Sequence, residues 1–461
     1  MRSRGARPAV LAGTLHLAEN SLGTLAVGVG GAFAWVCGLL LSTHSWVTFF
    51  LLSKPLVDLT WRWEFLNVFN QRVNPQAILA VLASGMNCLV ALLGRRKPRY
   101  SGRVLLLLAV ATISVILTPS SWGVNELLRL FSGVSFFFTA GLALGDQKRF
   151  HRFSIVFLVI LCVPLVLSLL QVAGFLPFEY WDWLENHEVG RASGTYQHPL
   201  EVIFFLVYAV PLGLYRLENS GSATLERAFL LIFSILAFAG LIFTFHRVGW
   251  VAIVLEVAIW FGLKKQVKRI LLSAVVVALL VAVFSDWVSL LYQPAAEIVS
   301  GQTDFASGDF LRGRGVNWAV FLASYAQGGP LRWVVGRGGS VVDASVGAYS
   351  NFAENEPHND FIRLLHAYGL AGLLLYFSFL LLFFRKGLRL KRSRVPFHSG
   401  VGRILSCCLV GVFLLSLTAE PMRYPTAIWY LFALGSVAMI LEQDLNASAP
   451  NGRSEGKEIV E

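Results

Sequence analysis

Residues 153–178 read FSIVFLVILCVPLVLSLLQVAGFLPF, without a single charged side chain. A helix that crosses a bilayer needs about 20 mostly apolar residues, because the hydrocarbon core is about 30 Å thick and each helical residue rises about 1.5 Å. This run is long enough, so it predicts a transmembrane helix. Twelve stretches of the chain share this character or come close to it: 21–42, 76–94, 104–122, 124–145, 153–178, 199–215, 228–245, 248–263, 270–285, 360–384, 404–419 and 424–441.

The composition agrees with this pattern. Of the 461 residues, 56% are hydrophobic and 14% are charged, which leaves too little polar surface to cover a soluble globule of this size. The sequence therefore predicts an all-α fold, a polytopic transmembrane helical bundle of about 12 spans. We expect one membrane domain over residues 1–445 and a polar cytoplasmic tail at 446–461. The large loop at about 286–359 contains an apolar helical stretch, Val316 to Tyr325, so we expect it to be partly folded.

The net charge of +11 comes from basic residues that concentrate in short connections between the apolar stretches. Basic residues beside membrane helices mark the cytoplasmic side. Because the densest clusters fall in alternate connections, they predict membrane orientation and not nucleic-acid binding, with both termini in the cytoplasm. The clusters are Arg95-Arg96-Lys97 with Arg99 and Arg103, Lys148-Arg149 with Arg152, Lys264-Lys265 with Lys268-Arg269, and the run from Arg385 to Arg394.

The segment from Trp46 to Leu59 complicates this count. A further full span there places the Arg95 cluster outside, so we interpret the segment as re-entrant or interfacial. The alternative is a thirteenth helix with the N-terminus outside. The first apolar stretch, 21–42, is long and lacks an Ala-x-Ala cleavage site, which favours a retained signal anchor.

No metal or cofactor site is predicted. The five cysteines all lie inside apolar stretches, where they are typical small core residues. The chain contains no Asp-x-Asp pair, no His-Glu-x-x-His and no phosphate-binding glycine loop. If the protein carries out phosphate chemistry, arginines must stabilise the negative charge that a metal ion otherwise neutralises.

Two arginines on the predicted outer side run against the orientation bias. Arg191 lies in a turn-rich loop before a span, and Arg247 interrupts a long apolar run, where burying a guanidinium costs several kcal/mol unless it is paired or hydrated. Guanidinium groups bind phosphate oxygens bidentately, so both arginines are candidates for binding a lipid-linked diphosphate. The alternative for Arg247 is that it marks a hairpin tip and extends to the interface.

Arg312 and Arg314 lie in the large loop, ahead of Trp318. Long translocated loops carry positive charge freely, so each of these arginines taken alone is typical of a solvated side chain. Together with their neighbours they are further candidates for binding a diphosphate.

His358-Asn359 stands where the large loop meets an apolar stretch, which places an imidazole at the membrane surface. An unperturbed histidine exchanges protons near neutral pH, so His358 is a candidate for a base that deprotonates a hydroxyl. His358, Ile362, His366 and Gly369 share one helix face by their spacing. His366 lies deeper, where a neutral structural imidazole is the favoured interpretation.

Lys54 and Asp58 are four residues apart, which is the spacing of an ion pair on one helix face. In a re-entrant segment Lys54 also has the option of reaching an anionic lipid headgroup. Structural pairing is the favoured interpretation.

Four patterns, in this order, resemble the O-antigen ligase and O-antigen polymerase superfamily of bacterial membrane glycosyltransferases. They are Arg191-Ala-Ser-Gly-Thr-Tyr with His198-Pro, Thr244-Phe-His-Arg247-Val-Gly, Arg314-x-x-x-Trp318 with Gly336-x-Gly338, and His358-Asn359 with Gly369 and Gly372. One departure is at Ala367, where related sequences often carry a glutamate two residues before the first glycine.

The resemblance implies a metal-independent enzyme without a cofactor, in the bacterial inner membrane, with its active site facing the periplasm. It implies transfer of a glycan from undecaprenyl diphosphate to an acceptor hydroxyl in lipopolysaccharide or exopolysaccharide biosynthesis. His358 is then the base, and Arg191, Arg247 and Arg312 or Arg314 hold the diphosphate. Asn359, His366 and Lys54 are supporting residues.

Several alternatives stay open. The acceptor is a glycan, a lipid or a protein, which separates a polymerase from a ligase and from a protein glycosylation enzyme. A transporter or flippase of lipid-linked saccharide also requires basic residues facing an anionic lipid, yet it requires access from both faces, often through broken helices. A structural membrane subunit explains the hydrophobicity but not the placement of arginine and histidine.

Overall fold

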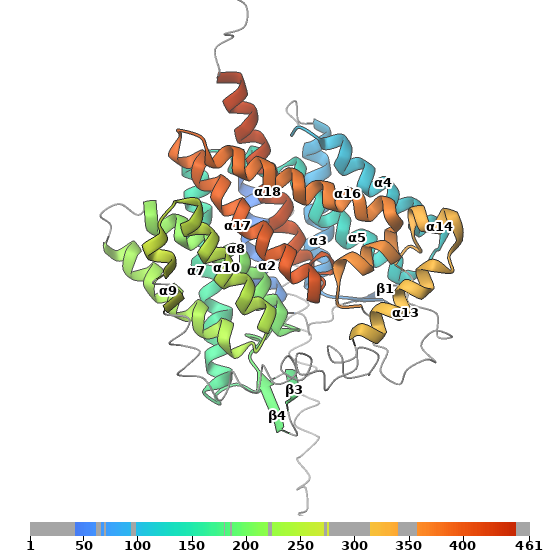
Figure 1. The fold of residues 1–461 in the computed structure, drawn as a ribbon, viewed down its shortest axis with the longest axis horizontal. Coiled ribbons are helices and arrows are strands. Elements are labelled where there is room, and N and C mark those ends of the chain that lie inside the picture. The colour runs from blue at the N-terminus through green and yellow to red at the C-terminus, as the bar shows by residue number, and fades with distance from the viewer. Residues whose placement is uncertain are drawn as a thin grey trace, which may run out of the picture.

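The computed structural model describes residues 42–60, 66–68, 71–93, 98–178, 180–184, 187–219, 224–271, 274–275, 314–339 and 357–448. These residues form a bundle of helices, which confirms the predicted all-α polytopic class (Figure 1). The helices are α2 (Thr43–Asp58), α3 (Pro75–Leu93), α4 (Ser101–Leu117), α5 (Ser121–Ser135), η1 (Phe136–Phe138), α6 (Ala140–Leu144), α7 (Gln147–Val172), α8 (Pro199–Asn219), α9 (Thr224–Phe243), α10 (Arg247–Leu263), α13 (Arg314–Ala326), α14 (Gly329–Val335), α16 (Asp360–Lys391), α17 (Pro396–Thr418), η3 (Pro421–Arg423) and α18 (Pro425–Ser448).

Two short antiparallel hairpins accompany the helices. β1 (Leu66–Val68) pairs with β2 (Gln71–Val73), and β3 (Tyr180–Leu184) pairs with β4 (His187–Arg191). In the second hairpin Tyr180 is opposite Arg191, so the ladder ends at the first residue of a predicted site motif.

Within the described residues, seven helices are long and apolar enough to cross a membrane: α3, α7, α8, α9, α16, α17 and α18. α18 is buried over 94% of its apolar window, whereas α9 is buried over 28%, so α18 forms the centre of the bundle and α9 exposes most of its surface to lipid. The predicted stretch 21–42 lies almost wholly outside the described residues, as does most of 270–285.

The bundle has two chemically different ends. We call the end where α16 begins the His358 end, and the opposite end, where α16 reaches Lys391, the basic end. At the basic end Lys264 and Arg403 both pair with Glu218 at 2.7 Å, and Lys386 lies 5.4 Å from the ring centre of Tyr100. The predicted basic clusters in the described residues therefore gather at the end opposite to His358.

Helix α2 is continuous and runs antiparallel to α18. The Thr426 hydroxyl donates to Asp58 near the His358 end, and the Tyr430 hydroxyl donates to the Leu51 carbonyl one turn further along α18. At the other end of α2, His44 bonds the carbonyl of Ala143. These contacts place α2 inside the bundle beside α18, with one end toward η3 and the other against α6.

The predicted span 124–145 is broken into α5, η1 and α6. Backbone groups freed inside a membrane need partners from within the protein. Polar side chains gather at this break: Asn87 of α3 donates to the Ser135 hydroxyl at 2.7 Å and accepts from Thr139 at 2.6 Å. The hydrophobic pattern predicted the span but not this interruption, because the partners come from another helix.

Helix α16 is kinked at Gly369, where φ is 66° and ψ is −169°. The segment that follows α14 docks into the kink: the backbone N–H groups of Arg337 and Gly338 donate to the carbonyls of His366 and Ala367, both at 2.8 Å. The Ser114 hydroxyl also donates to the Ala367 carbonyl. The large loop is therefore partly folded, as predicted, and is anchored on α16 and α4.

We predict that Gly369→Ala destabilises the protein strongly. This backbone conformation is almost exclusive to glycine and costs another residue about 1–3 kcal/mol, and a Cβ here collides with the backbone of Val334 and Gly336. Thermal unfolding in detergent measures the effect. The matched control is Gly85→Ala in α3, where a Cβ meets nothing within 4 Å, so little change or a small gain is expected. Equal melting temperatures for the two variants contradict the prediction.

Candidate active site

His358 is half-buried and has a left-handed backbone, with φ of 49°. This conformation is uncommon for a residue other than glycine and persists only where surrounding contacts impose it. The contact here is a hydrogen bond of 3.0 Å from the His358 backbone N–H to Oε1 of Glu420. Glu420 is only 2% exposed, so the histidine backbone is held by a buried carboxylate from the turn between α17 and α18.

The next two residues fix the start of α16. The Asn359 side chain accepts from the backbone N–H groups of Phe361 and Ile362, which caps the helix, and donates to the Leu417 carbonyl at 2.9 Å. Asp360 is fully buried and accepts from the Ser416 hydroxyl and the Met422 backbone. The Asn359 side chain therefore ties the start of the histidine's helix to the end of α17.

Helix α13 reaches the same place from the large loop. The Trp318 indole donates to the carbonyl of Pro357 at 2.7 Å, directly before His358. Arg314 is the first residue of α13, one turn ahead of Trp318. The structure thus brings the Arg314-x-x-x-Trp318 motif to His358. Arg312 lies outside the described residues.

Arg191 and the motif before α10 also come together. Arg191 is 8% exposed, and its Nε donates to the Thr244 carbonyl at 2.8 Å. The backbone of Ala192 bonds the carbonyl of Phe243 at 2.9 Å. His246 caps α10 by accepting from the Gly249 backbone, and Arg247 is the first residue of that helix. Both predicted outer arginines therefore sit at one short turn.

A chain of contacts connects this turn to the histidine. Gly249 of α10 packs against Ile203 of α8, and the neighbouring Phe204 ring lies 5.0 Å from the ring of Tyr424. Tyr424 directly follows η3, the turn that begins after Glu420. These contacts place the turn before α10, with Arg191 and Arg247, and the start of α16, with His358, at the same end of the bundle, the end toward β3, β4 and α13 in the lower half of Figure 1.

The side chain of His366 is buried and packed between helices. It is 3% exposed, packs edge-on against the Phe321 ring at 5.1 Å and lies 3.3 Å from the Ser324 hydroxyl. Arg337 donates to the same hydroxyl at 2.7 Å. These contacts join α13 to α16 and support the structural interpretation of this imidazole.

Lys54 pairs with Asp58, as its spacing predicted. The lysine is 3% exposed and lies 5.5 Å from the ring centre of Trp429, and Asp58 also accepts from Thr426. This enclosure supports the structural pair and leaves no route for Lys54 to a lipid headgroup.

Sequence reasoning missed a cluster of charged residues beside these motifs. Glu126 on α5 pairs with Arg363 on α16 and accepts from Arg129 at 3.1 Å. In the turn between α17 and α18, Nη1 of Arg423 lies 3.8 Å from Oε2 of Glu420. Burial lowers the pKa of the Arg423 guanidinium. The available signal was the presence of Glu126 and Arg129 inside an apolar stretch, since charged residues at membrane depth are rare.

Residues 232–377 match a family model described as O-antigen ligase. The match covers about a third of the chain and confirms the resemblance to that superfamily, because it includes Arg247, Arg314, His358 and the kink glycine. Arg191 and Lys54 lie outside it. No curated protein matches the chain. The similarity supports a glycosyltransferase-like role in glycan transfer for polysaccharide biosynthesis, at a membrane and with a lipid-linked glycan as substrate.

Proposed function

We propose that the protein transfers a glycan from undecaprenyl diphosphate to an acceptor hydroxyl, without a metal ion, at the periplasmic face of the bacterial inner membrane. The observation that carries this proposal is the position of His358. Contacts from α13, the α16 cap and the turn after α17 all fix it at one end of the bundle. These contacts hold the backbone before, at and after His358 from three directions, which fixes where its imidazole begins, as positioning of a catalytic group requires.

The orientation follows from the charges. Clusters of lysine and arginine favour the cytoplasmic side of a membrane. The clusters within the described residues gather at the basic end, so the His358 end faces the periplasm. Both termini are then expected on the cytoplasmic side.

The proposed reaction is a direct displacement. The acceptor hydroxyl gives its proton to the imidazole of His358 while its oxygen bonds to the anomeric carbon of the donor sugar. The bond from that carbon to the diphosphate oxygen breaks, and the diphosphate leaves with the bonding electrons. Arg191, Arg247 and Arg314 or Arg312 stabilise the negative charge that develops on it.

One observation favours a second candidate, a flippase for lipid-linked saccharide. The break at Phe136–Phe138 and the kink at Gly369 interrupt two membrane helices, a feature common in transporters. The charged candidates nevertheless gather at one end of the bundle, which favours the transferase.

We expect the purified protein to release undecaprenyl diphosphate from an undecaprenyl diphosphate-linked glycan only when an acceptor is present. Lipid extraction and mass spectrometry measure the released diphosphate, and candidate glycan, lipid and protein acceptors are supplied in separate reactions. The same protein in liposomes reports movement of intact lipid-linked glycan across the bilayer. Movement without release identifies the flippase and contradicts the transferase.

A further inference from the structure

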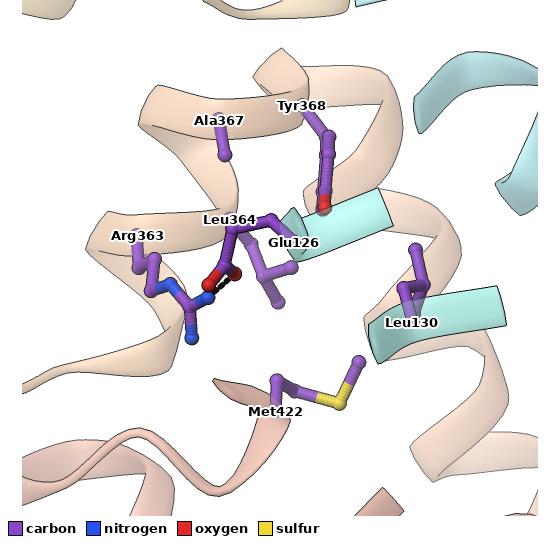
Figure 2. A pocket seen from close by; sticks show the side chains of 7 residues that line it. All are labelled: Glu126, Leu130, Arg363, Leu364, Ala367, Tyr368 and Met422. Atoms are coloured by element: carbon purple, nitrogen blue, oxygen red, sulfur yellow. Dashed lines mark ion pairs between the residues drawn. The ribbon is translucent and has the colours of Figure 1, made fainter. Parts of the chain in front are cut away.

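A pocket lies between α5 and the first turns of α16, next to the turn after α17. The free space between its side chains is about 10 Å³, roughly the room that one water molecule needs, and its polar lining comes from Glu126, Arg363 and Tyr368. Leu130 and Met422 supply apolar walls. Figure 2 shows the Arg363 and Glu126 side chains meeting across the pocket, with the Tyr368 hydroxyl directed toward the same space. The Glu126 carboxylate therefore lies against Arg363 where an anionic ligand would bind.

The ion pair in this pocket leaves part of the Arg363 guanidinium without a hydrogen-bond partner. Glu126 contacts two guanidinium groups, Arg363 and Arg129, and Nη1 of Arg363 is buried without a hydrogen-bond partner. Buried guanidinium nitrogens are normally hydrogen-bonded, because leaving one unsatisfied costs its full desolvation energy. A second anion in the pocket satisfies that nitrogen.

The place of the pocket relative to His358 indicates which substrate it serves. Arg363 is five residues after His358, at the start of the same helix, whereas Arg191 and Arg247 lie on the α8–α10 side. In a direct displacement the attacking hydroxyl and the leaving diphosphate are on opposite sides of the anomeric carbon. If the diphosphate is held on the α8–α10 side, the base and the acceptor are on the α16 side, where the pocket is.

We propose that the Glu126–Arg363 pocket binds an anionic group of the acceptor, a carboxylate of an acidic sugar or a phosphate, and that Glu126 holds the place of this anion until the acceptor arrives. This inference rests on the proposed transfer reaction, because it assigns the pocket to one of its two substrates. The incoming anion takes over Arg363, and the displaced Glu126 keeps its contact with Arg129. Acceptors without a negative charge then bind more weakly.

Anion binding tests the pocket without requiring turnover. The melting temperature of the full-length protein in detergent is titrated with sodium glucuronate, inorganic phosphate and neutral glucose. In Glu126→Gln the competing carboxylate is gone, so we expect glucuronate or phosphate to bind about tenfold more tightly than to the wild type. In the double variant Glu126→Gln with Arg363→Gln the guanidinium that binds the anion is gone, and the change at Glu126 avoids leaving a carboxylate without its partner. We expect this variant to lose the rise in melting temperature with added anion.

Arg332→Gln is the matched control, since Arg332 is exposed on α14 and lies outside the pocket. It should respond to anions as the wild type does. A response to glucuronate alone assigns the pocket to an acidic sugar, and a response to phosphate alone assigns it to a phosphorylated acceptor. Anion responses that are equal in Glu126→Gln and the double variant overturn the proposal, and the pair is then structural.

A farnesyl diphosphate titration separates this inference from the proposed function. If the double variant loses farnesyl diphosphate binding and Arg191→Gln keeps it, the pocket holds the donor and its assignment to the acceptor is wrong. If acceptor-dependent release occurs in the wild type without any anion response in Glu126→Gln, the transfer reaction stands and the pocket proposal fails. Absence of release with the anion response intact refutes the transferase alone.

Discussion

Replacing His358 by alanine will lower acceptor-dependent release of undecaprenyl diphosphate by about 10²–10⁴-fold, the usual contribution of a positioned general base. The imidazole is the proposed proton acceptor, and the backbone contact to Glu420 places it independently of the side chain. Transfer is measured with purified protein and in cells that carry only the variant. Because the side chain is half-buried, we expect the protein to insert and accumulate normally.

His358→Asn is the decisive companion variant. Asparagine tolerates the left-handed backbone better than most residues but accepts no proton near neutral pH, so it separates the chemistry from the conformation. We expect it to be as inactive as the alanine variant. His366→Gln serves as the control, because His366 packs between α13 and α16, and it should keep most transfer activity. Near wild-type activity of His358→Asn excludes His358 as the base.

The sequence predicted the membrane helices because each depends on its own apolar length. The breaks within them depend on distant partners. At the interruption after Ser135, Asn87 donates a hydrogen bond to Ser135 and accepts one from Thr139. At the kink at Gly369, hydrogen bonds come from Ser114 and from the segment after α14. Gly369 and Gly336 were noted as motif residues, but their spacing in the sequence gives no indication that they meet.

The candidate site likewise contains residues that could be identified from the sequence and residues that only the folded structure reveals. Arg191 was identified because basic residues on the predicted outer side run against the orientation bias, and His358-Asn359 because it places a proton-exchanging imidazole at the membrane surface. Glu420 carries no signal in the sequence, since its importance comes from a hydrogen bond to a residue 62 positions away. Glu126 and Arg363 are 237 positions apart, and only the packing of α5 beside α16 makes them one pocket.

The geometry around Arg191 also limits which substitutions the site accepts. A lysine keeps the positive charge but has neither the Nε–H that bonds the Thr244 carbonyl nor the planar fork that matches two phosphate oxygens. The bond to Thr244 connects Arg191 to the turn that begins α10 with Arg247. Loss of this bond is expected to loosen both arginines together.

Replacing Arg191 by glutamine is therefore expected to lower kcat by about 10²–10³-fold, the effect typical of removing one preorganised group that stabilises developing charge. The diphosphate gains charge as its bond to the sugar breaks, so the loss should fall on kcat more than on KM. Arg191→Lys should recover only a small part of the rate, and Arg332→Gln should be unaffected.

The measurement is steady-state release of undecaprenyl diphosphate at saturating acceptor. A change in KM alone means that Arg191 binds the donor equally in the ground and transition states, and full activity of Arg191→Lys means that charge alone is enough at this position.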